Sequence, residues 1–215
     1  PGHSARRYRK ELWHGVEVTR TPLWVPAQPS GLRRLLHLSS FALASLPVLL
    51  GQWRWRPDVV WVVAPALACT PGALALSKLS GARAWMHIQD YEVDAAFELG
   101  LLKGARLRAL VSACERWLMR RFDRVSTISQ RMIERARTKG VDDERLVHLP
   151  NWVDVSAVQP LEGPSSYRAQ LGIAPDAIVA LYSGNMGAKQ GLEVLSDLAR
   201  TLSHRPDIQF VYCGQ

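Results

Sequence analysis

The sequence lacks closely spaced cysteines. Its 215 residues hold three cysteines, Cys69, Cys114 and Cys213, without a Cys-x-x-Cys motif or a Cys/His ligand spacing. This distribution disfavours a disulfide framework and a structural zinc site. A reducing cytoplasm is therefore the simplest compartment. No signal peptide opens the chain. Because the chain begins with Pro and ends just after an apolar strand, we expect it to be a fragment cut at both ends.

The sequence also lacks an uninterrupted apolar run long enough to span a membrane. One candidate, residues 59–76, is broken by Pro65 and Pro71 and has Asp58 and Lys78 close to its ends. We interpret this run as a buried strand, a turn and a helix with Pro71 near its first position.

Basic residues are scarce after residue 150, where the chain holds 4 of its 27 Lys and Arg. Residues 1–150 carry a net charge of +10 and residues 151–215 a net charge of −2. The basic part favours an anionic surface, with a dispersed solvated face as the alternative. No RNP-like motif, zinc finger or convincing helix-turn-helix accompanies the arginines, so a membrane is favoured over nucleic acid. Trp53-Arg54-Trp55-Arg56, after apolar residues 32–50, suits a membrane interface, with a sheet-covering helix as the alternative.

Two common phosphate-binding motifs are missing: Gly-Lys-Ser/Thr and Gly-x-Gly-x-x-Gly. What is present, in residues 179–195, is an apolar strand followed by a turn with three glycines and Lys189, and then an amphipathic helix. Glycine permits a close approach to a ligand, and a helix N-terminus attracts anions. The segment therefore predicts a phosphate site, and a purely structural turn would also suit these glycines.

Short apolar segments alternate with helical patterns along the chain, which predicts an α/β fold with a parallel sheet. We expect a helix over 104–122 and another over 189–203. The apolar stripe of the first should consist of Leu107, Leu110, Val111, Cys114, Leu118 and Phe122. Expected strands are 16–20, 59–63, 84–88, 125–128, 146–149, 177–183 and 208–213.

Pro150 and the loop-like residues 154–166 predict a domain boundary. The charge balance changes at the same place. We therefore expect one α/β domain over residues 1–155 and the beginning of a second over 156–215.

Residues 87–94, His-Ile-Gln-Asp-Tyr-Glu-Val-Asp, follow a predicted strand. They should lie at the carboxyl end of the sheet, where open α/β folds bind ligands. Hydrogen bonding to sugar hydroxyls is the favoured interpretation. A metal site is a weaker alternative, and a solvated loop with His87 satisfied inside the sheet is another.

Four motifs occur in order: His87-Ile-Gln-Asp90, Ser126-Thr-Ile-Ser-Gln-Arg-Met132, His148-Leu-Pro-Asn-Trp-Val-Asp154 and Ser183-Gly-Asn-Met-Gly-Ala-Lys-Gln-Gly191. Together they resemble glycosyltransferase family 4, the retaining GT-B enzymes, and most closely the bacterial branch that makes colanic-acid-like, capsule and O-antigen chains. The resemblance spans essentially the whole chain.

The resemblance implies two Rossmann-like domains facing across a cleft, the first incomplete at its start and the second at its end. It implies a nucleotide-diphosphate-sugar donor held by the second domain, an acceptor held by the first, and no metal or redox cofactor. The implied catalytic residues are His87 and Asp90. The other implied site residues are Gly184, Asn185, Gly187 and Lys189 for the donor, and Glu92, Asp94, Ser129, Asn151 and Asp154 for the acceptor or hinge; Ser129 would serve equally as a helix N-cap.

The sequence departs from the family pattern at three places. Asn185 stands where many members carry arginine, no pair of glutamates is separated by seven residues, and the first strand with its glycine-rich loop is missing. The chain alone is therefore expected to be inactive.

The resulting functional prediction is a glycosyltransferase that moves a sugar from a nucleotide donor, with UDP favoured, onto a lipid-linked saccharide with retention. It would act peripherally on the cytoplasmic face of the plasma membrane, with no nucleic-acid partner. The alternatives are a GT-B-fold sugar-nucleotide epimerase and a non-catalytic basic module that binds membrane or nucleic acid.

Overall fold

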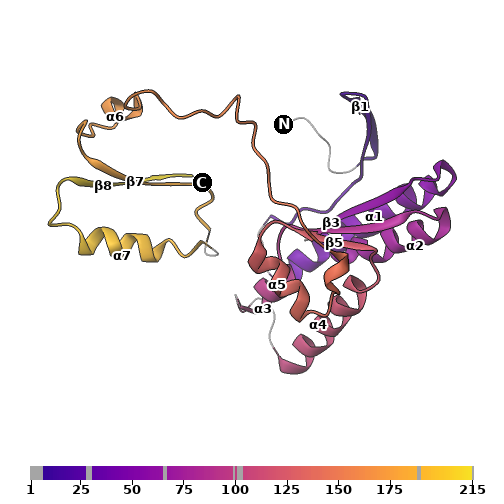
Figure 1. Cartoon of the computed structure of the whole chain (residues 1–215). Helices are drawn as coiled ribbons and strands as arrows, with labels where there is room; N and C mark the ends of the chain where they lie inside the picture. The colour runs from indigo at the N-terminus through magenta and orange to yellow at the C-terminus, as the bar shows by residue number, and fades with distance from the viewer. Residues whose placement is uncertain are drawn as a thin grey trace. The chain divides into compact units, whose positions relative to one another are not determined.

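A computed structural model describes residues 7–27, 31–64, 67–98, 100, 104–187 and 190–214 (Figure 1). The chain divides into two compact units, Pro1–Asn151 and Trp152–Gln215. The division falls just before the expected boundary at 155/156, and the acceptor and donor roles of the two parts stay predictions.

The first unit opens with a β-hairpin. Strands β1 (Arg9–Trp13) and β2 (Val16–Arg20) pair antiparallel, and an Arg20–Glu11 ion pair of 2.6 Å joins them. His14 and Gly15 connect the strands with φ angles of 48° and 82°. Two successive positive φ angles match the right-handed twist of a tight hairpin. The sequence predicted β2 and missed its partner strand.

The centre of the first unit is a four-stranded parallel sheet. Its strands are β3 (Val59–Ala64), β4 (Arg83–Ile88), β5 (Arg124–Thr127) and β6 (Leu146–His148), in the order β3-β4-β5-β6. These positions confirm the predicted α/β class and the four predicted strands, with ends shifted by one residue. Because all four strands are parallel, their carboxyl ends share one edge.

Helices connect the strands of this sheet. They are α1 (Gly31–Gly51), α2 (Thr70–Ser80), α3 (Glu92–Glu98), α4 (Ala105–Met119) and α5 (Gln130–Thr138), with short 3-10 turns η1 (Gln52–Trp55), η2 (Leu67–Cys69) and η3 (Asp143–Arg145). Helix α2 packs on β3 and β4, α1 packs on α2, and α5 packs on β5 and β6. The predicted helix over 104–122 is confirmed as α4. Its predicted apolar stripe is wrong at Leu107, Leu110 and Cys114, which are exposed.

The core lies on one face of the sheet. Val60, Val62 and Ala64 of β3 point into it, together with Met86 and Ile88 of β4, and Phe122 and Val125 complete it. The alternate residues of β3, Val59, Trp61 and Val63, are 44–47% exposed. The sequence predicted a buried strand here, and β3 is buried on one face only, alternating with a period of two as a half-buried strand does.

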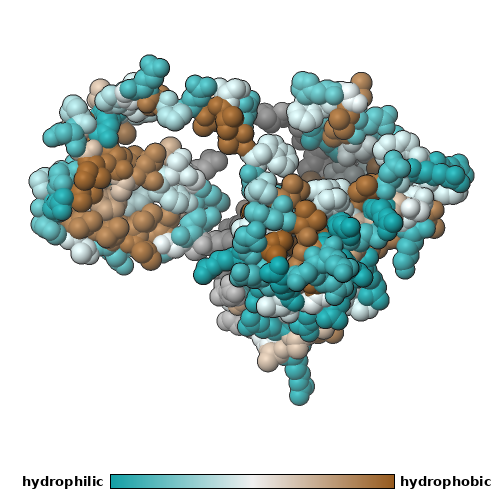
Figure 2. Space-filling view, in the orientation of Figure 1, coloured by the Kyte–Doolittle hydropathy of each residue, from teal (hydrophilic) through white to brown (hydrophobic). Residues whose placement is uncertain are grey.

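The second unit is a βαβ unit with little core. Strands β7 (Ile178–Ser183) and β8 (Ile208–Cys213) pair in parallel, joined through α7 (Glu193–Thr201), and the short helix α6 (Tyr167–Gln170) precedes them. Both strands were predicted. The helix expected over 189–203 begins later, after Gly191 with a φ of 61°. Among the described residues, Ala177 is the only buried apolar side chain of this unit, and Figure 2 shows apolar side chains on its surface.

Within the described part of the chain, no helix has both the length and the apolar character needed to cross a membrane.

Candidate functional site

Two turns meet at the carboxyl edge of the four-stranded sheet. Gln89 and Asp90 follow β4, and Asn151 follows β6, 62 residues later in the chain than Gln89. The side-chain amide of Gln89 donates a hydrogen bond of 3.0 Å to Oδ1 of Asn151. The structure therefore brings together Asn151 and the segment of His87 and Asp90, as their positions after parallel strands predict.

His87 lies inside the sheet, with 4% of its surface exposed. Its Nδ1 is 2.8 Å from Ser126 Oγ and its Nε2 is 2.7 Å from the Gln89 amide nitrogen. If that amide donates to Nε2, the imidazole proton is on Nδ1 and donates to Ser126. Ser126 also accepts a 2.8 Å hydrogen bond from Trp85 Nε1. Both ring nitrogens therefore have protein partners, which favours an indirect role through Gln89 over direct contact with a substrate.

The environment of His87 favours the neutral imidazole. Burial lowers the pKa of His87 below its usual value. Trp61 covers the imidazole, with the ring centres 5.4 Å apart, and stacks on Trp85 at 5.1 Å. A neutral, fully bonded His87 can orient the Gln89 amide, and its catalytic role stays a prediction.

Asp90 and Glu92 lie at the same edge. Asp90 is half-buried between the end of β4 and the start of α3, and Glu92 is the first residue of α3. Both positions are compatible with a ligand at the sheet edge. Their predicted roles remain untested.

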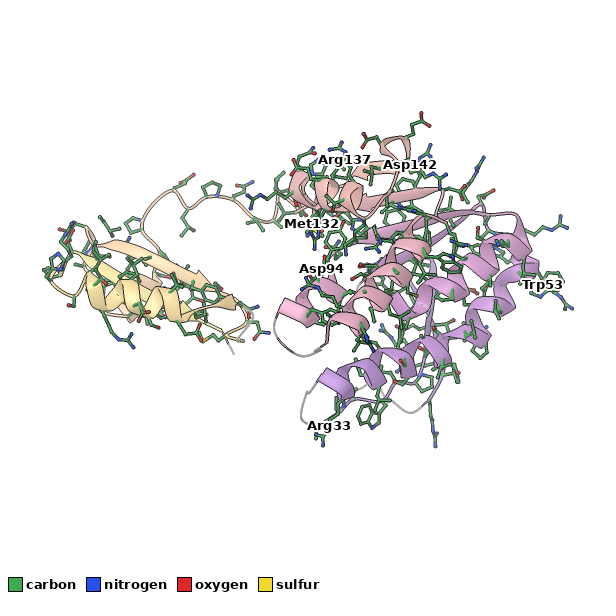
Figure 3. All side chains as sticks on the ribbon, turned by 90° about the horizontal axis from the view of Figure 1, so that it is seen from below. Arg33, Trp53, Asp94, Met132, Arg137 and Asp142 are labelled. Carbon is green, nitrogen blue, oxygen red and sulfur yellow. The ribbon has the colours of Figure 1, made fainter. Side chains whose placement is uncertain are left out.

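Asp94 belongs to a group of charges that we call the Lys139 cluster: buried Glu115 and Lys139, half-buried Asp94 and exposed Arg135. Lys139 Nζ lies 2.5 Å from Glu115 and 3.0 Å from Asp94, and Arg135 lies 2.9 Å from Asp94. Figure 3 shows Asp94 pointing toward the helix that carries Met132. The cluster joins α3, α4 and α5, so Asp94 holds α3 in place beneath the Asp90 turn.

The electrostatics of the Lys139 cluster differ between its two carboxylates. Burial raises the pKa of Glu115, and the hydrogen bond from Lys139 offsets this only in part. Burial also acts on Asp94, but hydrogen bonds from Arg135 and Lys139 bring the pKa of Asp94 below its usual value. The raised pKa of Tyr91 has the same cause, burial, with the charges of Glu115 and Asp94 adding to it. Sequence reasoning missed Glu115 and Lys139, because a charge on an amphipathic helix is ordinarily exposed.

Ser129 and Asp154, two of the residues predicted for the acceptor or hinge, each accept hydrogen bonds from residues that follow closely in the chain. Ser129 Oγ accepts a hydrogen bond of 3.3 Å from the Met132 amide, so Ser129 is the N-cap of α5. Asp154 Oδ1 accepts from the amide and hydroxyl of Ser156 and from the Ala157 amide, and these hydrogen bonds lower the pKa of Asp154. The division between the two units falls between Asn151 and Asp154.

The predicted donor turn follows β7. The Gly184 amide donates to Cys213 O at 2.9 Å, and Tyr182 Oη donates to Asn185 O at 2.7 Å. Exposed Asn185 and half-buried Gly187 complete the described part of the turn; Lys189 lies outside the described residues. The turn is thus held by its neighbouring strand and by Tyr182.

A further glycine, Gly214, is required at this turn. A Cβ on Gly214 would lie 1.8 Å from the backbone oxygen of Gly184, so only glycine fits here. The sequence analysis missed this residue. The signal for it was the position of Gly214 after β8, level with Gly184 after β7.

No group of three or more His, Cys, Asp or Glu side chains within the described ranges could hold a metal ion. The expectation that the protein needs no metal stays a prediction.

Comparison with known proteins gives consistent matches. The glycosyl transferase 4-like domain matches residues 1–152. The chain is 45% identical to WcaI of Escherichia coli K12, named as a colanic acid biosynthesis glycosyl transferase, over 99% of this chain and 53% of that protein. It is 32% identical to the 2-deoxystreptamine N-acetyl-D-glucosaminyltransferase of Streptomyces fradiae, over 82% of this chain and 42% of that protein.

The chain thus spans about half the length of the curated relatives it matches. Among solved structures, Anabaena HepE in complex with UDP-glucose aligns at 16% identity with a TM-score of 0.48, over 87% of this chain and 54% of that chain.

Proposed function

Because this chain belongs to the glycosyl transferase 4-like family, we propose that it is part of a retaining enzyme that transfers a sugar from a nucleotide diphosphate, with UDP favoured, to a lipid-linked saccharide. The main support within the structure is the Gln89–Asn151 hydrogen bond. It fixes the Asp90 turn at the carboxyl edge of the sheet. The acceptor of this hydrogen bond, Asn151, is the last residue before the second unit. That edge is where open α/β sheets bind ligands.

The proposed donor site is the turn after β7. Gly184, Asn185 and Gly187 present backbone and amide groups there, and Lys189 supplies a positive charge for the diphosphate. Leu192, the N-cap of α7, makes no side-chain capping hydrogen bond, and the Val194 amide donates to Gly191 O at 3.2 Å. In this proposal the positive end of the helix dipole attracts the diphosphate. Departure of the diphosphate would be eased by these groups, and no metal ion or dedicated base is required in this proposal.

The proposed acceptor is a saccharide on a polyprenyl diphosphate, at the cytoplasmic face of the plasma membrane. Leu36 and Leu43 on the outer face of α1 are 52% and 70% exposed, and Trp55 of η1 is 75% exposed. The Arg54 guanidinium lies 5.2 Å from the centre of the Trp53 ring. Exposed leucine and tryptophan beside arginine suit a peripheral contact with acidic lipid.

The name of the relative with the higher identity, WcaI, favours a role in polysaccharide assembly. WcaI is named for colanic acid biosynthesis, and the Streptomyces relative for transfer of N-acetyl-D-glucosamine. A hexose or an N-acetylaminosugar is therefore the first choice of donor sugar.

The test is turnover of UDP-sugars with and without lipid-linked acceptor, by a protein carrying this chain at the full length of its relatives. A transferase releases UDP and forms a lipid-linked product only when the acceptor is present. Conversion of the free UDP-sugar into an epimer without acceptor would favour the epimerase, and the 215-residue chain alone should show neither reaction.

Membrane attachment has a separate test in vesicle flotation. Binding to acidic vesicles should exceed binding to neutral ones and should weaken as salt is raised, because each basic group near such a surface contributes about 1 kcal/mol. Equal binding to both vesicle types would contradict the electrostatic part of the proposal.

A further inference from the structure

A groove lies between α2 and α4 at the amino edge of the four-stranded sheet, the edge opposite Gln89 and Asp90. Its volume is about 710 Å³, within the range of small-molecule sites. Leu74, Ala75, Trp117 and Leu118 contribute apolar walls. The described contacts of the candidate transfer site do not include any of these residues.

The polar groups in the groove walls are already hydrogen-bonded. Ser77 Oγ donates to Ala82 O at 2.5 Å, and the Asp123 carboxylate accepts from the Ala84 amide at 2.8 Å and from Arg83 at 3.2 Å. A sugar or a nucleobase needs several polar partners in its pocket. These walls suit a hydrocarbon chain better, since burying it requires only apolar surface.

The rim of the groove is positively charged. Lys78, Arg83 and Arg121 line it, with Asp123 as the one acidic lining residue. Asp123 pairs with Arg83, and in the described ranges Lys78 and Arg121 form no ion pair. The Arg121 guanidinium lies 3.4 Å from the centre of the Trp117 ring and donates to Trp117 O at 2.9 Å. Two positive charges at the mouth of an apolar groove are therefore left for an anion.

We propose that this groove binds one acidic phospholipid of the bilayer, with the phosphate at Lys78 and Arg121 and an acyl chain between α2 and α4. The proposal rests on the membrane contact proposed above and assigns it a specific lipid site. The η1 turn packs on α2 and directly precedes β3. Exposed Trp53 and Trp55 therefore lie at the same edge of the sheet as the groove, where a bilayer surface would reach both.

The test uses the 215-residue chain and dihexanoyl phosphatidylglycerol, titrated below the concentration at which it forms micelles and followed by calorimetry. Arg121→Gln should weaken binding about fivefold, the usual effect of one basic group near an acidic lipid. The matched control is Arg116→Gln, which removes the same charge from an exposed position of α4 outside the groove and should change nothing. Ala75→Trp should block the groove, with its melting temperature checked against the unaltered chain.

Other outcomes would overturn the inference. Equal losses in Arg121→Gln and Arg116→Gln would indicate general charge attraction without a lipid site. Binding of glycerol phosphate as tight as that of the lipid would indicate a phosphate site that does not use the apolar walls. Vesicle binding that survives Ala75→Trp and Arg121→Gln unchanged would leave membrane attachment to α1 and η1 and remove the groove from it.

Discussion

The two units of the chain differ in how the turns that carry the predicted site residues are supported. In the first unit, the Asp90 turn rests on a buried core, the Gln89–His87–Ser126 hydrogen bonds and the Lys139 cluster. In the second unit, the turn after β7 is held by one parallel strand pair and by Tyr182, and both strands carry exposed apolar residues. The geometry of the first turn therefore depends on distant packing, and that of the second on its immediate neighbours.

The largest expected effect tests the difference in cores. Phe122→Ala removes a fully buried ring from the first unit and should lower its free energy of unfolding by about 3–5 kcal/mol. Leu181→Ala in β7, where the side chain is 63% exposed, should cost less than about 0.5 kcal/mol. Urea unfolding followed by circular dichroism measures both. Similar losses in the two variants would contradict the comparison.

The next effect concerns the Lys139 cluster. Lys139→Met should destabilise the first unit by about 3 kcal/mol, because it leaves Glu115 and Asp94 without their shared buried cation. The matched control is Arg137→Met, two residues earlier in α5, whose ion pair with Asp143 is exposed and should contribute little to stability. If the two variants unfold at the same urea concentration, the cluster does not support α3.

A smaller, local effect is expected in the second unit. Gly214→Ala places a methyl group against the backbone oxygen of Gly184 and should displace the turn, weakening UDP binding at least about tenfold in a protein of the relatives' full length. Gly163→Ala is the control, because no atom lies within 4 Å of its added Cβ and its φ is not positive. Calorimetric UDP affinities that match in the two variants would show that the turn tolerates the displacement.

The smallest effect is a pH dependence carried by His87. Burial lowers its pKa in the folded state, so the unfolded chain binds more protons below about pH 6.5, and stability is lost as the pH falls through the folded pKa. His87→Gln should remove this loss and flatten the stability curve below that pH. Parallel curves for the variant and the unaltered chain would show that His87 titrates alike in both states.

Strand alternation and turn chemistry predicted much of the fold, and tertiary context decided the rest. The strands of the two parallel sheets follow from short apolar segments, and the capping role of Ser129 follows from its position before a helix. The buried face of α4 was not predicted from its leucines, because it is the face that carries Glu115, which pairs with Lys139 at the end of another helix. The exposed face of β3 was also missed, because a run of valines is equally typical of a strand covered on one face and of a strand covered on both.

The candidate site was predictable as a neighbourhood, because residues after parallel strands meet at one edge. Its hydrogen-bond pattern was not. Gln89 and Ser126 belong to the quoted motifs, but nothing in the sequence shows that they contact His87. Ser126 becomes its neighbour only through the register of β4 and β5, and Gln89 only through the course of the chain just after β4.

The most direct test of the central claim compares Asp90→Asn with Lys189→Ala in a protein of the relatives' full length, measuring UDP affinity by calorimetry and kcat with radiolabelled UDP-sugar. The account predicts that Asp90→Asn lowers kcat by about 10²-fold or more and leaves UDP affinity unchanged. Lys189→Ala should weaken UDP binding by about 1.5–3 kcal/mol, the contribution of a charged hydrogen bond. Normal turnover in Asp90→Asn together with unchanged UDP affinity in Lys189→Ala would contradict the assignment of the acceptor site to the Asp90 turn and of the donor site to the turn after β7.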